Sequence, residues 1–185
     1  GPLGPGQYYA YAYANGYFSQ MYNGLDCGAA CSDFAHATPI SITQSGQQVR
    51  ADFNLHPLPV LSGHVRDAVS GLPLANVAVA VGTNPPQSFF PQSTTTTNAN
   101  GDFALSGVPA GTYYVWAQSN DHVDQIFSGI TCEQNNSYAY WHAICDVAGA
   151  TLLKIAPGQT PPFLDFSLNR SASVSGHAIV RAGPG

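Results

Sequence analysis

The stretch from Ser62 to Gln118 begins with SGHVRDAVSGLPLANVAVAV (62–81) and ends with TTTTNANGDFALSGVPAGTYYVWAQ (94–118). Apolar and aromatic residues alternate in both parts, so that Val77, Val79 and Val81 fall on one face with alanines between them. A period of two in β-branched and aromatic residues indicates strands. Gly, Asn and Pro punctuate these runs and supply turns. We therefore predict an all-β, antiparallel sandwich with no helix in this stretch.

Three motifs in the same stretch carry a family resemblance. They are G-x-V-x-D-x-x-x-G-x-P-L at the start of 63–79, N-G-x-F-x-L at 100–105 and V-P-x-G-x-Y at 108–113. In this order they resemble a carboxypeptidase regulatory-like domain. The resemblance implies an Ig-like (transthyretin-like or collagen-adhesin B-type) sandwich of about seven strands. It also implies a non-catalytic appendage, spacer or adhesive repeat.

The composition excludes several classes of function. Only 8% of the 185 residues are charged, the net charge is −5, and the one lysine is Lys154. Phosphate binding needs clusters of Lys and Arg, so we expect no nucleic-acid partner. No apolar run approaches the ~20 residues of a membrane span. The lysine-poor, Ser/Thr/Asn-rich sequence with four cysteines instead suggests secretion and disulfides, and we expect an extracellular or cell-surface protein.

The four cysteines allow three pairings. They are Cys27, Cys31, Cys132 and Cys145. Their spacings, one short and one long, do not fit the paired short spacings of a zinc site, so disulfides are favoured over metal. The internal repeat described next favours the pairs Cys27–Cys31 and Cys132–Cys145.

The chain contains an internal repeat. Residues 8–27 align without a gap on 113–132, at an offset of 105. Beyond the cysteine loops the offset becomes 113, with 51–55 on 164–168 and Ser62-Gly63-His64 on 175–177. We therefore expect 1–58 to be the back part of an incomplete sandwich, 59–170 a complete one, and 171–185 the first strand of a further repeat. On this view the opening Gly-Pro-Leu-Gly is native sequence.

The two partial repeats are complementary, which suggests that the chain assembles with itself. A sheet that lacks strands exposes unpaired backbone groups and an apolar face. The 171–185 segment is the candidate donor strand for the 1–58 segment of another copy, in a head-to-tail filament. The interface residues expected on this hypothesis are Tyr9, Tyr11, Tyr13, Tyr17, Val174, Gly176, His177, Ile179 and Arg181. A long tandem array from which the chain is one excised piece remains the alternative.

The remaining chemistry points away from catalysis and cofactors. The six histidines show no H-E-x-x-H or His-plus-carboxylate spacing, and there is no G-x-S-x-G elbow. We expect no enzyme activity, no cofactor and no metal, and we interpret His64 as a hydrogen-bonded strand histidine. Asp121, Asp124 and Glu133 could bind Ca²⁺, but a solvated loop is the preferred interpretation. Lys154 lies too late for the isopeptide bond of some collagen-adhesin B-type domains.

Aromatic density supports a second hypothesis, a carbohydrate- or surface-binding adhesive module. Aromatic rings offer an apolar face and a polar tip to a sugar. Tyr138, Tyr140 and Trp141 lie in the longer cysteine loop and are the candidate glycan contacts. Glycan or a cell surface would then be the partner, in addition to other copies of the chain.

Overall fold

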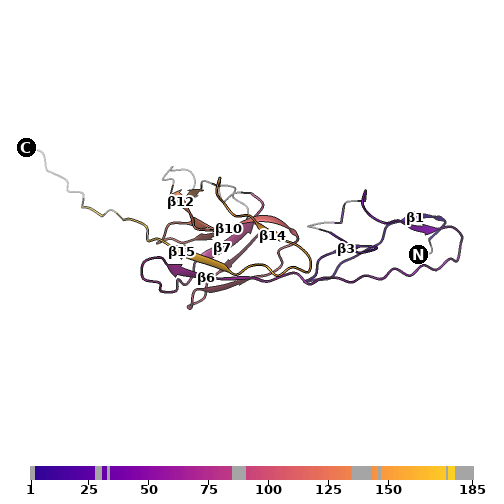
Figure 1. Cartoon of the computed structure of the whole chain (residues 1–185), viewed down its shortest axis with the longest axis horizontal. Helices are drawn as coiled ribbons and strands as arrows, with labels where there is room; N and C mark the ends of the chain where they lie inside the picture. Colours follow the sequence, from indigo (N-terminus) through magenta and orange to yellow (C-terminus); the bar gives the residue numbers. More distant parts are fainter. Residues whose placement is uncertain are drawn as a thin grey trace, which may run out of the picture.

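The computed structural model describes residues 3–27, 31–32, 34–84, 91–134, 143–145, 147–173 and 175–177. Figure 1 shows an elongated molecule with a small N-terminal body at one end, a larger sandwich in the middle, and a C-terminal tail that leaves the opposite end. The described residues contain strands and no α-helix, and therefore no helix that could cross a membrane. The prediction of an all-β fold is confirmed.

The strands fall into two groups. The N-terminal body contains β1 (Gly6–Tyr8), β2 (Tyr11–Ala12), β3 (Gln20–Met21), β4 (Leu25–Asp26) and β5 (Ile40–Ile42). The sandwich contains β6 (Leu61–Asp67), β7 (Ala78–Gly82), β8 (Ser93–Thr96), β9 (Asp102–Leu105), β10 (Gly111–Gln118), β11 (Gln125–Ile126), β12 (Ile130–Gln134), β13 (Ala143–Cys145), β14 (Leu153–Ile155) and β15 (Leu164–Leu168).

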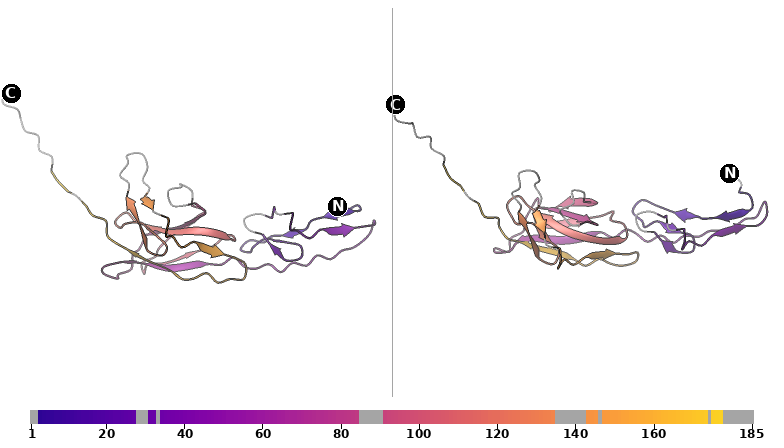
Figure 2. Two further views of the ribbon diagram at one scale, coloured as in Figure 1. Left: turned by 45° about the horizontal axis from the view of Figure 1, so that its top comes forward. Right: turned by 90° about the horizontal axis from the view of Figure 1, so that it is seen from above.

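Two sheets face each other in the sandwich (Figure 2). One has the order β15-β6-β9, and the other has the order β13-β12-β11-β10-β7-β8 with β14 also paired to β10. The alternating residues predicted to face one way are buried between them: Val77, Val79, Val81, Phe103, Leu105, Tyr113 and Val115. Burial of these apolar side chains is the main stabilising term of the domain.

A second, smaller cluster covers the outer face of the larger sheet. Trp116 and Ala80, which point away from the main core, pack there with Ile126 and the Cys132–Cys145 disulfide. The sheet is therefore apolar on both faces near β10, which explains why Tyr113, Val115, Trp116 and Ala117 are all buried although they alternate along one strand.

One strand pair differs from a purely antiparallel sandwich. β15 pairs parallel to β6, with Leu164 opposite Gly63 and Leu168 opposite Asp67. The chain reaches β15 from β14, which belongs to the other sheet. Because the connection crosses between sheets, β15 starts at the same end as β6 and runs in the same direction. The pair is well packed, since Leu164, Phe166 and Leu168 are fully buried.

Candidate functional site

The N-terminal body repeats, strand by strand, the later strands of the sandwich. In β1–β5 Gly6 pairs with Ile42, and in β10–β14 Gly111 pairs with Ile155. These positions differ by 105 and 113, the two offsets in the sequence. The pairings of β2 with β3 and of β3 with β4 recur in the same register between β10 and β11 and between β11 and β12. The N-terminal body and the later strands of the sandwich therefore have the same strand pairing and register.

Side-chain hydrogen bonds recur at the same offsets. The Gln20 side chain donates to the Asn54 carbonyl (3.2 Å) and accepts from the Asn54 N–H (3.1 Å). Gln125 makes the equivalent two bonds to Ser167 (3.0 and 3.3 Å). Each glutamine satisfies one backbone donor and one backbone acceptor of a neighbouring extended segment, so it anchors that segment at the edge of the domain.

A tyrosine occupies the same corner in both regions. The Tyr8 hydroxyl donates to the Gly4 carbonyl (2.8 Å), and the Tyr113 hydroxyl donates to the Pro109 carbonyl (3.0 Å). Burial raises the pKa of Tyr113, because the phenolate would be poorly solvated there. The corner therefore keeps its hydroxyl protonated and fixes the turn that leads into the strand.

Among the described residues the N-terminal body has no counterpart of β6, β7, β8 or β9. Residues 51–55 correspond to β15, but the described residues hold no strand beside them in the place of β6. Phe53 contacts Tyr22 in the body (ring centroids 6.4 Å apart), as Phe166 contacts Phe127 in the sandwich (6.1 Å). Phe166 is fully buried, whereas Phe53 is only partly buried. The face of the body that carries Phe53 is therefore more exposed than the equivalent face of the sandwich.

A second edge of the body is also open. β10 pairs with β7 through residues 114–118. The equivalent residues 9–13 have no partner strand of that kind among the described residues, and Tyr9, Tyr11 and Tyr13 are 46%, 59% and 76% exposed. Tyr11 and Tyr13 stack on each other with ring centroids 6.2 Å apart. The edge thus presents unpaired backbone and a row of tyrosine rings.

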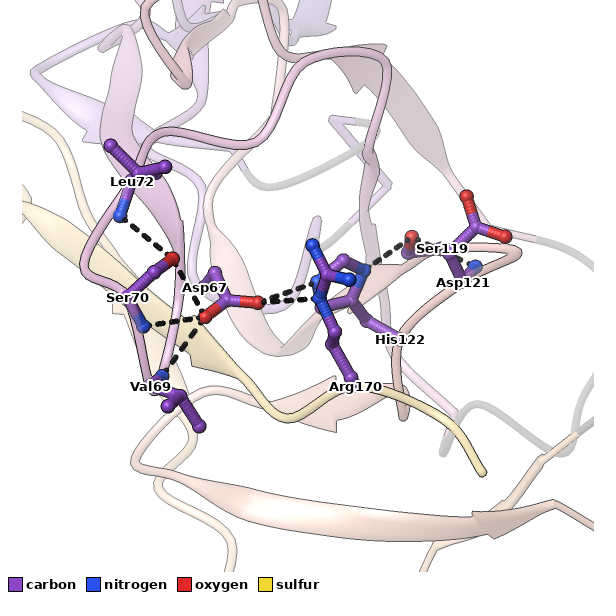
Figure 3. Close-up of polar contacts among 8 residues, drawn as sticks. All are labelled: Asp67, Val69, Ser70, Leu72, Ser119, Asp121, His122 and Arg170. Atoms are coloured by element: carbon purple, nitrogen blue, oxygen red, sulfur yellow. Dashed lines mark hydrogen bonds and ion pairs between the residues drawn. The ribbon is translucent and has the colours of Figure 1, made fainter. Parts of the chain in front are cut away.

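A buried polar cluster closes the far end of the complete sandwich (Figure 3). Asp67, at the end of β6, accepts hydrogen bonds from the backbone N–H groups of Val69 and Ser70 and from the Ser70 hydroxyl. Its other oxygen lies 3.2 Å from Nε2 of His122 and 3.3 Å from Nε of Arg170. The hydrogen bonds from the Ser70 N–H and hydroxyl, from His122 and from the Val69 N–H hold the pKa of Asp67 well below its usual range.

The cluster ties three distant parts of the chain together. Asp67 is 4% exposed and His122 is 6% exposed, while Arg170 lies at the surface. A buried carboxylate is tolerated where hydrogen bonds and opposite charge surround it. On the side away from Asp67, Nδ1 of His122 lies 3.4 Å from Oγ of Ser119, and a pocket lined by residues 120–122 and 170–173 borders the cluster. The contacts of Asp67 hold the end of β6 to the turn after it, to His122 and to Arg170, and in this sense the cluster is a structural clamp on β6.

Comparison with known proteins assigns the central part of the chain. The family model of the carboxypeptidase regulatory-like domain matches residues 60–140. This part of the chain is similar to a carboxypeptidase regulatory-like domain. The match begins at β6, and it includes the three motifs that carry the resemblance in the sequence.

No curated protein matches the chain. Among solved structures, a streptococcal ancillary pilin is similar over 87% of this chain, at 14% identity and a TM-score of 0.40. The chain spans 40% of the length of that pilin.

The cysteines pair as the repeat favours. Cys27 bonds to Cys31, and Cys132 bonds to Cys145, which joins β12 to β13 in the sandwich. All four cysteines are used in these two bonds. The preference for disulfides over a zinc site is confirmed.

The expected interface residues lie in two separate places. Tyr9, Tyr11, Tyr13 and Tyr17 are exposed on the N-terminal body. Gly176 and His177 are exposed in the tail, at the other end of the molecule (Figure 1). The structure does not bring the two sets together within one chain. Val174, Ile179 and Arg181 lie outside the described residues, as do the glycan candidates Tyr138, Tyr140 and Trp141.

The histidines and acidic residues find local partners. His64 lies on β6 and its Nδ1 is 2.7 Å from the Asp102 carboxylate, which fits the interpretation of a hydrogen-bonded strand histidine. Asp124 was expected to lie in a solvated loop, but the structure buries it. Its carboxylate accepts a hydrogen bond from the Ser119 N–H (3.1 Å). Among the described residues no group of three or more His, Cys, Asp or Glu side chains is arranged to hold a metal ion.

The contact between His122 and Asp67 was not predicted. The two residues are 55 positions apart, and no local spacing signals the pair. One available signal was that Asp67 belongs to the first family motif, and another was that His122 replaces a tyrosine of the other repeat, Tyr17.

Proposed function

We propose that this protein is a non-catalytic, extracellular structural protein that assembles head-to-tail into a filament by β-strand complementation. In this proposal residues 1–58 are the back part of an incomplete sandwich, 59–170 form the complete one, and 171–185 are a donor strand. The donor strand of one copy adds to the 1–58 segment of the next.

The observation that carries the proposal is the state of residues 51–55. They repeat β15 in sequence, in the two hydrogen bonds between Asn54 and Gln20, and in the contact between Phe53 and Tyr22. The described residues nevertheless hold no equivalent of β6 beside them. The tail repeats the Ser-Gly-His of β6 at the same offset. An incomplete sheet with an exposed edge is a template for strand addition.

The arrangement of the molecule favours addition between copies. The tail leaves the sandwich at the end opposite the N-terminal body (Figure 1). Residues 169–174 are the connection available for turning back, and six residues span at most about 20 Å. A strand from one end that adds to a body at the other end of a second copy makes a heterologous contact, and such contacts generate filaments when the rotation does not close.

The extracellular location is supported by the two disulfides. Disulfides persist in oxidising compartments and are rare in the cytosol. Of the two bonds, Cys27–Cys31 lies in the N-terminal body and Cys132–Cys145 lies in the sandwich.

The test is removal of the tail. A variant that lacks residues 171–185 should remain folded and soluble as monomers or small oligomers, while the full chain forms filaments in negative-stain images. Retention of both disulfides, measured by mass spectrometry, and an unchanged thermal melt would serve as controls for folding. Filaments of unchanged length without the tail would overturn the proposal.

The adhesive module remains the second candidate because of the stacked, exposed Tyr11 and Tyr13. Stacked rings on an open surface suit a sugar face. This candidate predicts that Trp141→Ala abolishes retention on immobilised glycans without a change in particle size. Unchanged retention would count against it.

A further inference from the structure

We propose that the donor strand adds to a second copy in the parallel register of β6 on β15, with Gly176 opposite Ala51 and Val180 packed against Tyr17 and Pro57. This inference rests on the proposed function and adds the register and the recognition chemistry. The β6–β15 pair of the sandwich serves as the template: the tail takes the position of β6, and residues 51–55 of another copy take the position of β15.

The register follows from the repeat offset. In the sandwich, Leu164 pairs with Gly63 and Leu168 pairs with Asp67. At an offset of 113, the two β15 positions become Ala51 and Leu55, and the two β6 positions become Gly176 and Val180. A shift of one residue would turn every side chain of the added strand to the opposite face, so the register is a strict prediction.

Gly63 shows why this position accepts only glycine. A Cβ built on Gly63 would overlap the carbonyl oxygen of Leu164 and would also contact the ring of Phe103. The carbonyl belongs to the paired strand and cannot move without breaking the pair. Glycine in a strand commonly marks such a close approach of two backbones.

Gly176 keeps this glycine where the isolated chain does not require it. A Cβ built on Gly176 meets no atom within 4 Å, and its φ lies outside the region that favours glycine. No contact with the described residues of the same chain therefore requires a glycine at this position. It is explained if the carbonyl of Ala51 from another copy takes the place of the Leu164 carbonyl.

The far end of the strand gives an independent match. In the sandwich, the position of Asp67 lies beside His122 and Arg170, two basic side chains that pair with the carboxylate. The body carries Tyr17 and Pro57 at the equivalents of His122 and Arg170, and the bridge between these two residues recurs in both regions. The tail carries Val180 at the equivalent of Asp67. All three polar residues are replaced by apolar or aromatic ones.

The joint replacement makes the tail specific for the body. A carboxylate over Tyr17 and Pro57 would be buried without an opposite charge, which is costly, whereas valine gains from contact with them. Conversely, valine over His122 and Arg170 would leave both basic groups without a carboxylate. The first strand of the sandwich and the donor strand are thus not interchangeable.

The first experiment tests the glycine. Gly176→Ala should raise the critical concentration for filament formation at least about tenfold, a change of about 1.4 kcal/mol, because the new methyl group meets a backbone carbonyl. The matched control is Ser175→Ala, which lies on the opposite face and should assemble normally. Assembly of Gly176→Ala at the wild-type concentration would overturn the register.

The second experiment transfers the polar cluster. Val180→Asp should weaken assembly by about 100-fold or more, as expected for an unpaired buried charge. Combining it with Tyr17→His and Pro57→Arg should restore filaments, and the triple variant should not co-assemble with wild-type copies. Failure of the two added substitutions to rescue Val180→Asp would overturn the assignment of Val180 to this site.

The outcomes separate this inference from the proposed function. If deletion of 171–185 abolishes filaments but Gly176→Ala and Val180→Asp do not, the tail is the donor strand in another register, and only the inference is overturned. If filaments form without the tail, both are overturned.

Discussion

Asp67 fastens the first strand of the sandwich to the turn after it and to two distant basic side chains. Replacing it by asparagine keeps the shape but removes the charge that pairs with His122 and Arg170. We expect Asp67→Asn to lower the melting temperature clearly, measured by circular dichroism. Ser62→Ala, on the same strand and away from the cluster, serves as the control. An unchanged melting temperature for Asp67→Asn would contradict the clamp.

The same carboxylate makes stability depend on pH. The Ser70 N–H and hydroxyl and the nearby His122 hold the pKa of Asp67 below its usual range. Because the pKa is lowered on folding, the stabilisation is complete above the unfolded-state value of about 4 and is lost as pH falls below it. The melting temperature of the wild type should therefore fall more steeply than that of Asp67→Asn between about pH 5 and pH 2. Parallel pH profiles would contradict this.

Gly63 provides a matched comparison with the tail. Gly63→Ala forces a methyl group against the Leu164 carbonyl, and we expect it to destabilise the sandwich by about 1–3 kcal/mol in urea unfolding. Gly176→Ala should leave the unfolding of the isolated chain unchanged. Equal effects of the two substitutions on monomer stability would contradict the claim that a methyl group is excluded at Gly63 and accommodated at Gly176 in the single chain.

Residue-level contacts were the least predictable part of the molecule. His122 and Asp67 lie 55 positions apart, and only the fold places their side chains together. The turn around Asp67 was predictable from its Gly and Ser residues, but the second role of the carboxylate was not. Asp124 was expected in a solvated loop and is buried instead, because the loop folds back so that its carboxylate caps the Ser119 N–H.

At the level of elements, β15 is held to the sandwich by β6 on one side and by the Gln125 side chain on the other. Gln125→Ala leaves the Ser167 N–H and carbonyl unsatisfied, and we expect a loss of about 2 kcal/mol in the free energy of unfolding. Hydrogen exchange should speed up at Ser167 in particular. Protection at Ser167 equal to that in the wild type would contradict the anchoring of β15 by the Gln125 side chain.

The Cys132–Cys145 disulfide joins β12 to β13 across a sequence separation of 13. Its removal by Cys132→Ala with Cys145→Ala should cost about 3 kcal/mol, because the loop it closes is of medium length. Removal of Cys27–Cys31, with a separation of 4, should cost less. The two costs can be compared by urea unfolding of the two double variants, and the reverse order would contradict the loop-length argument.

Strand positions were largely predictable because alternation in 77–81 and 102–105 reports directly which face is buried. The offsets of 105 and 113 also located the short strands of the N-terminal body, whose local alternation is weak. The parallel pairing of β15 and the cluster around Trp116 could not be predicted in this way. Both depend on how the two sheets connect and on which outer face later strands cover.

At the level of the whole molecule, the N-terminal body and the exposed tail lie at opposite ends of the sandwich (Figure 2). Under the proposed head-to-tail addition, each copy would contribute two units along a filament: the sandwich, and a smaller unit built from the N-terminal body of one copy and the tail of another. Image reconstruction should show an axial repeat of two such units for each 19.4 kDa chain. A repeat of one unit per chain would contradict the shared unit.

The most direct measurement is cross-linking between two differently marked copies. His64 pairs with Asp165 in the sandwich, so Asp52 of one copy should lie opposite His177 of another. Asp52→Cys and His177→Cys, placed in separate copies and mixed under mild oxidation, should form a disulfide between residues 52 and 177 that mass spectrometry detects. Ser45→Cys in place of Asp52→Cys sets the background. A yield from the 52–177 pair no higher than that background would contradict strand addition between copies.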